Sequence, residues 1–256
     1  MMNSLDEQAV AMVIGASGGI GFALTQRLLE HSSVGCVWAA CRTPDTPALD
    51  ALVRRHGARL LALEMDVTDE GAIAEAFATV KERTPQLHLL INAFGLLHDE
   101  AAGIWPEKRI EEISAAGLEA NFRVNAMAPA LIARHAFALL NHRQRAVFAS
   151  LSARVGSISD NRMGGWYAYR ASKAAQNMLT ASLAIEAQRR AKRLIFLALH
   201  PGTTDSSLSA PFQSRVPDGK LFSPDFAASQ LLSRIDNASI EDSGHFYAWD
   251  GAPIPW

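Results

Sequence analysis

The chain has 256 residues, of which 49% are hydrophobic, so it is long enough and apolar enough to bury a full-sized core in one domain. Lys and Arg number 24 and Asp and Glu number 26, which leaves a formal net charge of -2 and no broad basic field for nucleic acid or an anionic membrane. Without a spanning apolar run or a signal-like start, and with only Cys36 and Cys41 as cysteines, the chain is predicted to be cytoplasmic, to lack a disulfide framework and to take small-molecule partners.

Short apolar runs alternate along the chain with longer amphipathic segments. Runs that are apolar throughout are typical of strands covered on both faces, as in a parallel sheet. The alternation predicts an α/β fold: a single doubly wound, Rossmann-type parallel sheet of about seven strands with helices on both faces. The expected strands are 9–15, 36–41, 59–65, 87–92, 146–152, 194–200 and 245–250, and the expected helices are 20–32, 69–83, 117–140 and 170–191.

We expect residues 1–256 to form a single domain. The two least regular stretches, 94–112 and 203–223, each follow a predicted strand end. In open parallel sheets, ligands bind beyond the carboxyl ends of the strands. These stretches are therefore the predicted walls of a substrate cleft.

A glycine-rich turn, VIGASGGIG, joins the first strand to the first helix and spaces Gly15, Gly19 and Gly21 as G-x-x-x-G-x-G. Such a turn lets the backbone approach a pyrophosphate, and the helix that follows offers unpaired N–H groups to it. In this strand, turn and helix context we expect a dinucleotide site.

The same letters, Gly15 to Gly19, also match G-x-S-x-G, the nucleophile elbow of acyl hydrolases, with Ser17 as nucleophile. An elbow after the very first strand has no upstream loop to complete an oxyanion hole. The downstream His200 and Asp205 also come in the reverse of that fold's order. We therefore favour the dinucleotide site.

The end of the second strand, AACRT, places Cys41 where an NAD-selective fold presents an acid to the ribose 2′-OH, and Arg42 follows. A guanidinium can clamp a 2′-phosphate, whereas an acid repels it, so NADP(H) is predicted in preference to NAD(H), which remains possible. The alternative for Arg42 is a solvated side chain at a strand end. Asp66, after the third strand, is a candidate acceptor for the adenine amino group, and Asp69 is a predicted helix N-cap.

In the stretch YAYRASK, Tyr169 lies four residues before Lys173, whereas Tyr167 lies six before it. Residues four apart share one face of a helix, so only Tyr169 is expected to face the lysine. An ammonium group near a phenol stabilises the phenolate and lowers the phenol pKa from its usual value near 10 toward the range useful for proton transfer.

Taken in order, these motifs resemble the classical short-chain dehydrogenase/reductase family. The resemblance covers about residues 9–250. Besides the glycine turn and the Tyr169–Lys173 pair, four further motifs carry this resemblance: N-A-F-G at 92–95, the asparagine of RVNAMAP, a serine near the end of the fifth strand and Pro-Gly after the sixth. The segments around 151–179, 199–209 and 244–256 look closest to sniffer-type carbonyl reductases and C-factor-like bacterial proteins.

The resemblance implies roles for particular residues. Tyr169 would be the general acid–base, Lys173 would lower its pKa and hold the nicotinamide ribose, and Asn125 would help to hold a proton-relay water. By the same resemblance, Gly15, Ser17, Ile20 and Gly21 would line the phosphate side, Asn92 would lie at the adenosine ribose, and Pro201, Gly202 and Thr203 would lie near the nicotinamide. Together with the candidates from the motifs themselves, the residues expected to bind the cofactor are Gly15, Ser17, Gly19, Ile20, Gly21, Arg42, Asp66, Asn92, Ala93, Gly95, Tyr169, Lys173, Pro201, Gly202 and Thr203.

Two positions depart from the family pattern. Phe94 adds bulk where the pattern has a small residue, and Ala153 stands where the family's serine is usual. Ser150 and Ser152 point to the same side of a strand, because strand side chains alternate between its faces. We expect Ser152 to hydrogen-bond the substrate oxygen, with Ser150 as the second candidate.

The predicted function is an NADP(H)-dependent oxidoreductase that moves hydride between nicotinamide and a carbonyl or secondary alcohol of a small molecule. The alternative is an NAD(P)-binding sensor or signalling protein with incidental catalysis. No paired metal-ligand motif occurs among the histidines, so no metal site is predicted. The alanine-rich segments 115–140 and 171–190 suit packing between subunits in the mode implied by the resemblance, so a homodimer or homotetramer is expected.

Overall fold

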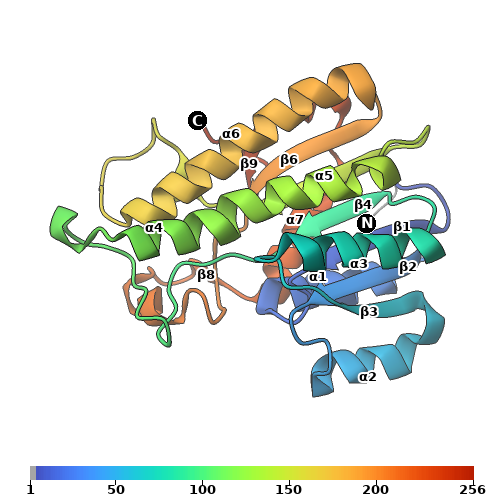
Figure 1. The fold of residues 1–256 in the computed structure, drawn as a ribbon, viewed down its shortest axis with the longest axis horizontal. Coiled ribbons are helices and arrows are strands. Elements are labelled where there is room, and N and C mark those ends of the chain that lie inside the picture. Colours follow the sequence, from blue (N-terminus) through green and yellow to red (C-terminus); the bar gives the residue numbers. More distant parts are fainter. Residues whose placement is uncertain (1–3) are drawn as a thin grey trace.

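The structure is a computed structural model that describes residues 4–256. Its centre is one seven-stranded sheet with the order β3-β2-β1-β4-β5-β6-β9, and every neighbouring pair is parallel. The predicted α/β fold is therefore confirmed (Figure 1). The strands are β1 (Ala9–Ile14), β2 (Val34–Cys41), β3 (Leu60–Glu64), β4 (Leu89–Asn92), β5 (Ala146–Leu151), β6 (Leu194–His200) and β9 (His245–Ala248).

Helices cover both faces of this sheet. One buried core joins the sheet to α1, α2 and α7, and a second core joins it to α3, α5 and α6. The helices are α1 (Gly19–Glu30), α2 (Pro47–His56), α3 (Glu70–Arg83), α4 (Ala115–Phe122), α5 (Ala128–Leu140), α6 (Tyr167–Arg190) and α7 (Pro224–Asp236).

Strand β5 illustrates why the predicted runs are apolar throughout. All six of its residues are buried: Val147 and Ala149 enter the first core, whereas Ala146 and Phe148 enter the second. Because successive side chains of a strand point to opposite faces, a strand covered on both sides is apolar at most positions, and the buried Ser150 of β5 is satisfied by a hydrogen bond from Asn92.

The structure contains two helices that the sequence-based assignment lacks, α2 and α7. Each begins with a hydroxyl N-cap followed by proline: the Thr46 side chain accepts from the Leu49 N–H before Pro47, and Ser223 accepts from the Phe226 N–H before Pro224. Hydroxyl caps and proline at the first helical position are start signals that a sequence can carry.

The long helix expected at 117–140 is interrupted. It consists of α4, a π-helical turn η3 (Arg123–Met127) and α5. Asn125 lies within this turn and is buried. Single π-helical turns inside α-helices frequently occur at functional sites, and this one contains a candidate catalytic asparagine.

The turn between β1 and α1 is tightly closed. Gly15 adopts φ 88, and a Cβ on Gly21 would lie 2.1 Å from the Gly15 carbonyl oxygen. Backbone therefore occupies the space that any side chain at position 21 would need. The start of α1 folds directly back on the end of β1. This explains why glycine is needed at positions 15 and 21, two of the three positions in the predicted glycine motif.

We predict that Gly21→Ala lowers the free energy of unfolding by about 3 kcal/mol, because the new methyl group forces the backbone of the turn apart. Gly18→Ala is the matched control in the same turn. Its Cβ would lie 3.5 Å from the Gly15 oxygen, an ordinary contact, so it should cost about 1 kcal/mol or less. Urea denaturation measures both, and equal losses would contradict the steric explanation.

Candidate active site

Three candidate site residues, Gly95, Asn125 and Lys173, meet just beyond the carboxyl end of β4. A Cβ placed on Gly95 would lie 3.3 Å from Asn125 Oδ1 and 3.6 Å from Lys173 Nζ. On its other side, the glycine turn of β1 approaches the same loop, since a Cβ on Gly15 would lie 2.9 Å from the Ala93 oxygen. The fold thus brings together segments more than 150 residues apart in the chain.

Asn125 links this loop to α6. Its Oδ1 accepts from the Leu96 N–H at 2.8 Å, and its Nδ2 donates to the Leu96 oxygen at 2.7 Å and to Ser172 Oγ at 3.0 Å. Ser172 Oγ in turn donates to the Tyr169 carbonyl oxygen at 2.9 Å. The side chain of Asn125 therefore ties the loop after β4 to the turn of α6 that carries Tyr169.

Tyr169 is only 7% exposed, and its burial raises the pKa of the phenol above the usual value. Tyr167, two residues earlier, is exposed. The Nζ atom of Lys173 lies 5.9 Å from the centre of the Tyr169 ring. Tyrosine 169 and the lysine thus share a helix face, as their spacing predicts.

The Lys173 amine is buried, and this burial lowers its pKa to about 7. It donates to the Leu151 oxygen at 2.8 Å and to Gln176 Oε1 at 2.9 Å. Its hydrogen bonds therefore run to the end of β5 and to its own helix. In this arrangement burial dominates the pKa of both the phenol and the amine.

The two candidate serines are both buried but have different partners. Ser152 Oγ donates to Asn177 Oδ1 on α6 at 2.7 Å, and Ser150 Oγ accepts from Asn92 Nδ2 at 2.9 Å. Ser152 lies one residue past β5 and next to Leu151, whose carbonyl holds the lysine amine. Ser150 instead lies within β5, and its partner Asn92 is the last residue of the neighbouring strand β4.

The expected phosphate side lies at the N-terminus of α1. Gly18 at the N-cap supplies no side-chain acceptor, and the first turn contains no acidic residue. Ser17 and Gly19 are exposed there, whereas Ile20 is partly buried against the core. A helix N-terminus of this kind presents N–H groups and a positive dipole end to an anion.

Asn92 provides a further observation. Its Oδ1 atom is buried and has no hydrogen-bond partner among residues 4–256, while its Nδ2 is held by Ser150. A buried acceptor without a partner is costly. A ligand hydroxyl donated to this atom would remove that cost, which fits the ribose expected at this position.

Arg42 and Asp66 lie near each other at the ends of β2 and β3. Arg42 is exposed. Asp66 Oδ1 accepts from the Thr68 N–H and hydroxyl, each at 2.8 Å. The Thr68 N–H, chiefly, and also the Arg42 charge lower the pKa of Asp66. Both side chains stand at the edge of the expected adenosine side, Arg42 without a hydrogen-bond partner in the described part of the chain.

On the other side of β1 from β2 and β3, the residues after β6 are Pro201, Gly202 and Thr203. Gly202 has φ 77, and a Cβ there would lie 2.5 Å from the Phe222 ring and 3.1 Å from Trp249. Strand β7 (Thr203–Thr204) pairs with β8 (Leu221–Phe222) and starts the second irregular stretch. Two aromatic rings thus support the backbone at the expected nicotinamide end.

The two irregular stretches contact each other, and the second one contacts the start of α6. His98 Nε2 lies 3.2 Å from the Ser207 oxygen, and the His98 ring meets the edge of Phe212 at 5.9 Å. Phe212 also lies 5.1 Å from Trp166, whose ring packs edge-on 6.3 Å from Tyr169. In Figure 1 the loop that leads into α4 and the orange segment around β8 lie at the same end of the molecule as the start of α6.

Gln176 and Asn177 are site residues that the sequence reasoning missed. They hold the side chains of Lys173 and Ser152. Gln176 could have been found from its position three residues after Lys173, on the same helix face. Asn177 could not, because its partner comes from the end of a distant strand.

Among the described residues, no group of three or more His, Cys, Asp and Glu side chains is arranged to hold a metal ion. None of the helices in this part of the chain is both long and apolar enough to cross a membrane.

Comparison with known proteins defines the class. Residues 9–216 match the family model described as short chain dehydrogenase, so the chain belongs to the short-chain dehydrogenase/reductase family of oxidoreductases. C-signal of Myxococcus xanthus is 30% identical over 181 residues, which cover 71% of this chain and 99% of that protein.

Solved structures of carbonyl reductases agree with this family assignment. The NADPH-bound carbonyl reductase from chicken fatty liver superposes with a TM-score of 0.86 at 28% identity, covering 100% of this chain and 96% of that one. Carbonyl reductase Sniffer of D. melanogaster has the same fold, with a TM-score of 0.84 at 23% identity over 98% of this chain and 100% of that one. The family and the subgroup expected from the sequence are thereby confirmed.

We predict that Lys173→Met stabilises the ligand-free protein at pH 7 and below, and that this advantage shrinks as the pH rises toward 10. The amine has a pKa of about 7 when folded and 10.5 in the reference state. Between these values the unfolded wild type binds more protons, so wild-type stability rises with pH, and the methionine variant lacks this gain.

Urea denaturation between pH 6.5 and 10 measures the difference. Lys192→Met, which removes an exposed lysine on the loop after α6, is the control for the loss of one positive charge. Identical pH profiles for the two variants would contradict a buried amine at position 173.

Proposed function

We propose that the protein is an NADP(H)-dependent oxidoreductase that transfers hydride between nicotinamide and a carbonyl or secondary alcohol of a small molecule. The observation that carries this proposal is the meeting of Asn125, Lys173 and the loop after β4 at Gly95, with Tyr169 on the adjoining helix face. The likeness to an NADPH-bound carbonyl reductase supports it.

The residues present fit such a cofactor. The uncapped N-terminus of α1 and the glycine turn suit its pyrophosphate. The unpartnered Oδ1 atom of Asn92 suits a ribose hydroxyl. Bound there, the cofactor supplies the hydride, and the protein supplies position, polarisation and the proton.

Tyr169 is the proposed proton donor and acceptor. Because burial raises the pKa of its phenol, the hydroxyl stays protonated at neutral pH, which is the state that reduction of a carbonyl requires. For oxidation of an alcohol, the same oxygen must accept a proton. A charged Lys173 amine nearby would favour that state, since a cation stabilises phenolate.

Ser152 is proposed to donate a hydrogen bond to the substrate oxygen. Its hydroxyl would have to leave Asn177, to which it now donates. Ser150 remains the second candidate, although its bond with Asn92 holds it within the sheet. A donor at the substrate oxygen stabilises the charge that develops there as hydride arrives at the carbon.

A second candidate function has one specific observation in its favour. The C-signal protein of Myxococcus xanthus is 30% identical to this chain. An NAD(P)-binding signalling protein with incidental catalysis is therefore the alternative. Sustained oxidation of NADPH with aldehydes, ketones or quinones favours the enzyme, and tight cofactor binding without turnover favours the alternative.

We further propose a homodimer or homotetramer formed through the helices at 115–140 and 171–190. Met178 and Ile185, both on α6, expose 68% and 59% of their surface in the single chain. Pairing would remove these apolar side chains from water. Sedimentation equilibrium that returns the mass of one chain would exclude this assembly.

We predict that Tyr169→Phe retains NADPH binding but lowers kcat by on the order of 10²–10⁴, because the proton donor is lost while the ring keeps its packing. The matched control is Tyr167→Phe, which removes an exposed hydroxyl two residues away. Steady-state kinetics on the best carbonyl substrate of the screen test this, and unchanged turnover in Tyr169→Phe would refute the role.

For cofactor choice, we predict that Arg42→Ala weakens NADPH binding about 10-fold and leaves NADH binding nearly unchanged, because only NADPH offers a 2′-phosphate to the guanidinium. Arg189→Ala, at the far end of α6, controls for the change in net charge. Fluorescence titration gives the affinities. Equal wild-type affinities for NADPH and NADH would overturn the preference.

A further inference from the structure

The helix that carries Tyr169 and Lys173 has an unusual start. Gly164, Gly165 and Trp166 all adopt left-handed backbone conformations, with φ 63, 64 and 50. Trp166 is the N-cap of α6 and provides no side-chain acceptor. Since the first N–H groups of a helix have no partner within it, the start of α6 needs acceptors from another part of the chain.

Glu107 supplies these acceptors from the segment 94–112. Its carbonyl oxygen accepts from the Trp166 N–H at 2.5 Å, and its Oε2 atom accepts from the Ala168 N–H at 3.2 Å. Ala168 directly precedes Tyr169 in the chain. Glu107 is 4% exposed, so its carboxylate is buried at this contact. One glutamate therefore caps α6 from 61 positions upstream.

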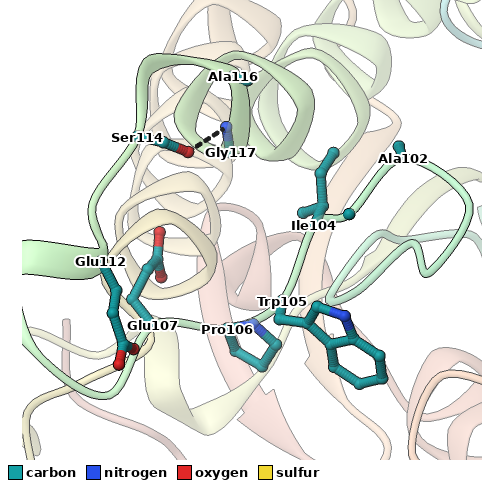
Figure 2. Close-up of a pocket in the computed structure, with 10 residues that line it drawn as sticks. Ala102, Ile104, Trp105, Pro106, Glu107, Glu112, Ser114, Ala116 and Gly117 are labelled. Carbon is teal, nitrogen blue, oxygen red and sulfur yellow. Dashed lines mark hydrogen bonds between the residues drawn. The ribbon is translucent and has the colours of Figure 1, made fainter.

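The same carboxylate also faces the first turn of α4. A Cβ on Gly117 would lie 3.7 Å from Glu107 Oε1, and Ser114 Oγ caps α4 by accepting from the Gly117 N–H at 3.1 Å. Figure 2 shows the Glu107 side chain rising from the loop toward Ser114 and Gly117. The carboxylate thus lies between the starts of two helices.

This position explains how an acidic side chain is tolerated in the interior. Within residues 4–256, Glu107 forms no salt bridge. The N-terminal end of a helix carries a partial positive charge, and here two such ends face one carboxylate. An apolar residue at position 107 would leave the Ala168 N–H without its acceptor.

The two helices lead directly to the proposed catalytic groups. Helix α4 continues into η3, which holds Asn125, and α6 holds Tyr169 and Lys173. Among residues 4–256, the hydrogen bonds of Asn125 reach Tyr169 through Ser172 Oγ, so the spacing of the helices decides whether these groups align.

We infer that Glu107 is a positioning residue of the active site: its carboxylate holds the first turn of α6 against that of α4 and so fixes Tyr169 relative to Asn125. The inference rests on the proposed function, because it gives Tyr169 a catalytic task. Displacement of a catalytic group by about 1 Å can reduce turnover about 100-fold.

The test compares Glu107→Ala, Glu107→Gln and wild type. Glu107 lines a cavity of about 250 Å³, so the truncated side chain leaves space that water can enter, and the alanine variant is expected to fold. Glu107→Ala should lower kcat roughly 10- to 100-fold with KM for NADPH changed less than about twofold. Glu107→Gln retains an acceptor and should keep at least about half of the wild-type kcat.

Ser239→Ala is the control for loss of a helix cap. Ser239 forms a capping box with Asp242 far from Tyr169, at the start of the short helix η6 (Ile240–Asp242). If Glu107→Ala has the kcat of Ser239→Ala, Glu107 is a structural cap only and the inference is wrong. If Glu107→Gln keeps wild-type amide exchange at Ala168 but loses as much turnover as Glu107→Ala, holding the first turn of α6 is not what supports turnover, and the inference is also wrong.

Amide hydrogen exchange in the cofactor-free protein separates this inference from the proposed function. Glu107→Ala should accelerate exchange at Ala168 and its neighbours in the first turn of α6, whereas Ser239→Ala should not. Unchanged exchange there overturns the positioning role, whatever the turnover. A wild type without turnover, or a fully active Tyr169→Phe, overturns the proposed function instead.

Discussion

The burial of one amine against the end of a strand is the constraint on which the site depends. Lys173 donates to the Leu151 oxygen at the end of β5, and a Cβ on Gly156 would lie 2.8 Å from Lys173 Cβ. Helix α6 therefore lies directly on the segment that follows β5. Because buried polar groups are normally hydrogen-bonded, the pairing of the amine with the Leu151 oxygen holds the part of α6 that carries Tyr169 against the strand end next to Ser152.

Much of the fold could be predicted from the sequence because local patterns determine it. The apolar runs match the seven strands of the sheet to within two residues at every end, and Tyr169 and Lys173 share a face because four residues span about one helical turn. The glycine turn was predictable for the same reason. Its geometry depends on neighbours in the chain, and Gly21 leaves no space for a side chain.

The remainder depended on contacts between distant segments. The π-helical turn at Asn125 has no signature in RVNAM, and the partners of Ser152 and Lys173 come from the packing of α6 on β5. Glu107 was not distinguished from other acidic residues of its loop. Its importance arises only when α4 and α6 are brought side by side, which no local pattern reports. The loops at 94–112 and 203–223 were predicted to be cleft walls, but their mutual contact could not be read from either one.

The contact between these two loops also bears on the access of small molecules to Tyr169. The rings of His98, Phe212 and Trp166 form a row of contacts that ends at Tyr169, whose side chain is almost entirely hidden from water. In the proposed reaction, a substrate would have to reach this phenol past side chains of the segments 94–112 and 203–223. In the proposed reaction, movement of these loops would be a step separate from the transfer of hydride and proton. In enzymes built in this way, departure of the product commonly sets the pace, and substrates that differ greatly in intrinsic reactivity are then processed at similar maximal rates.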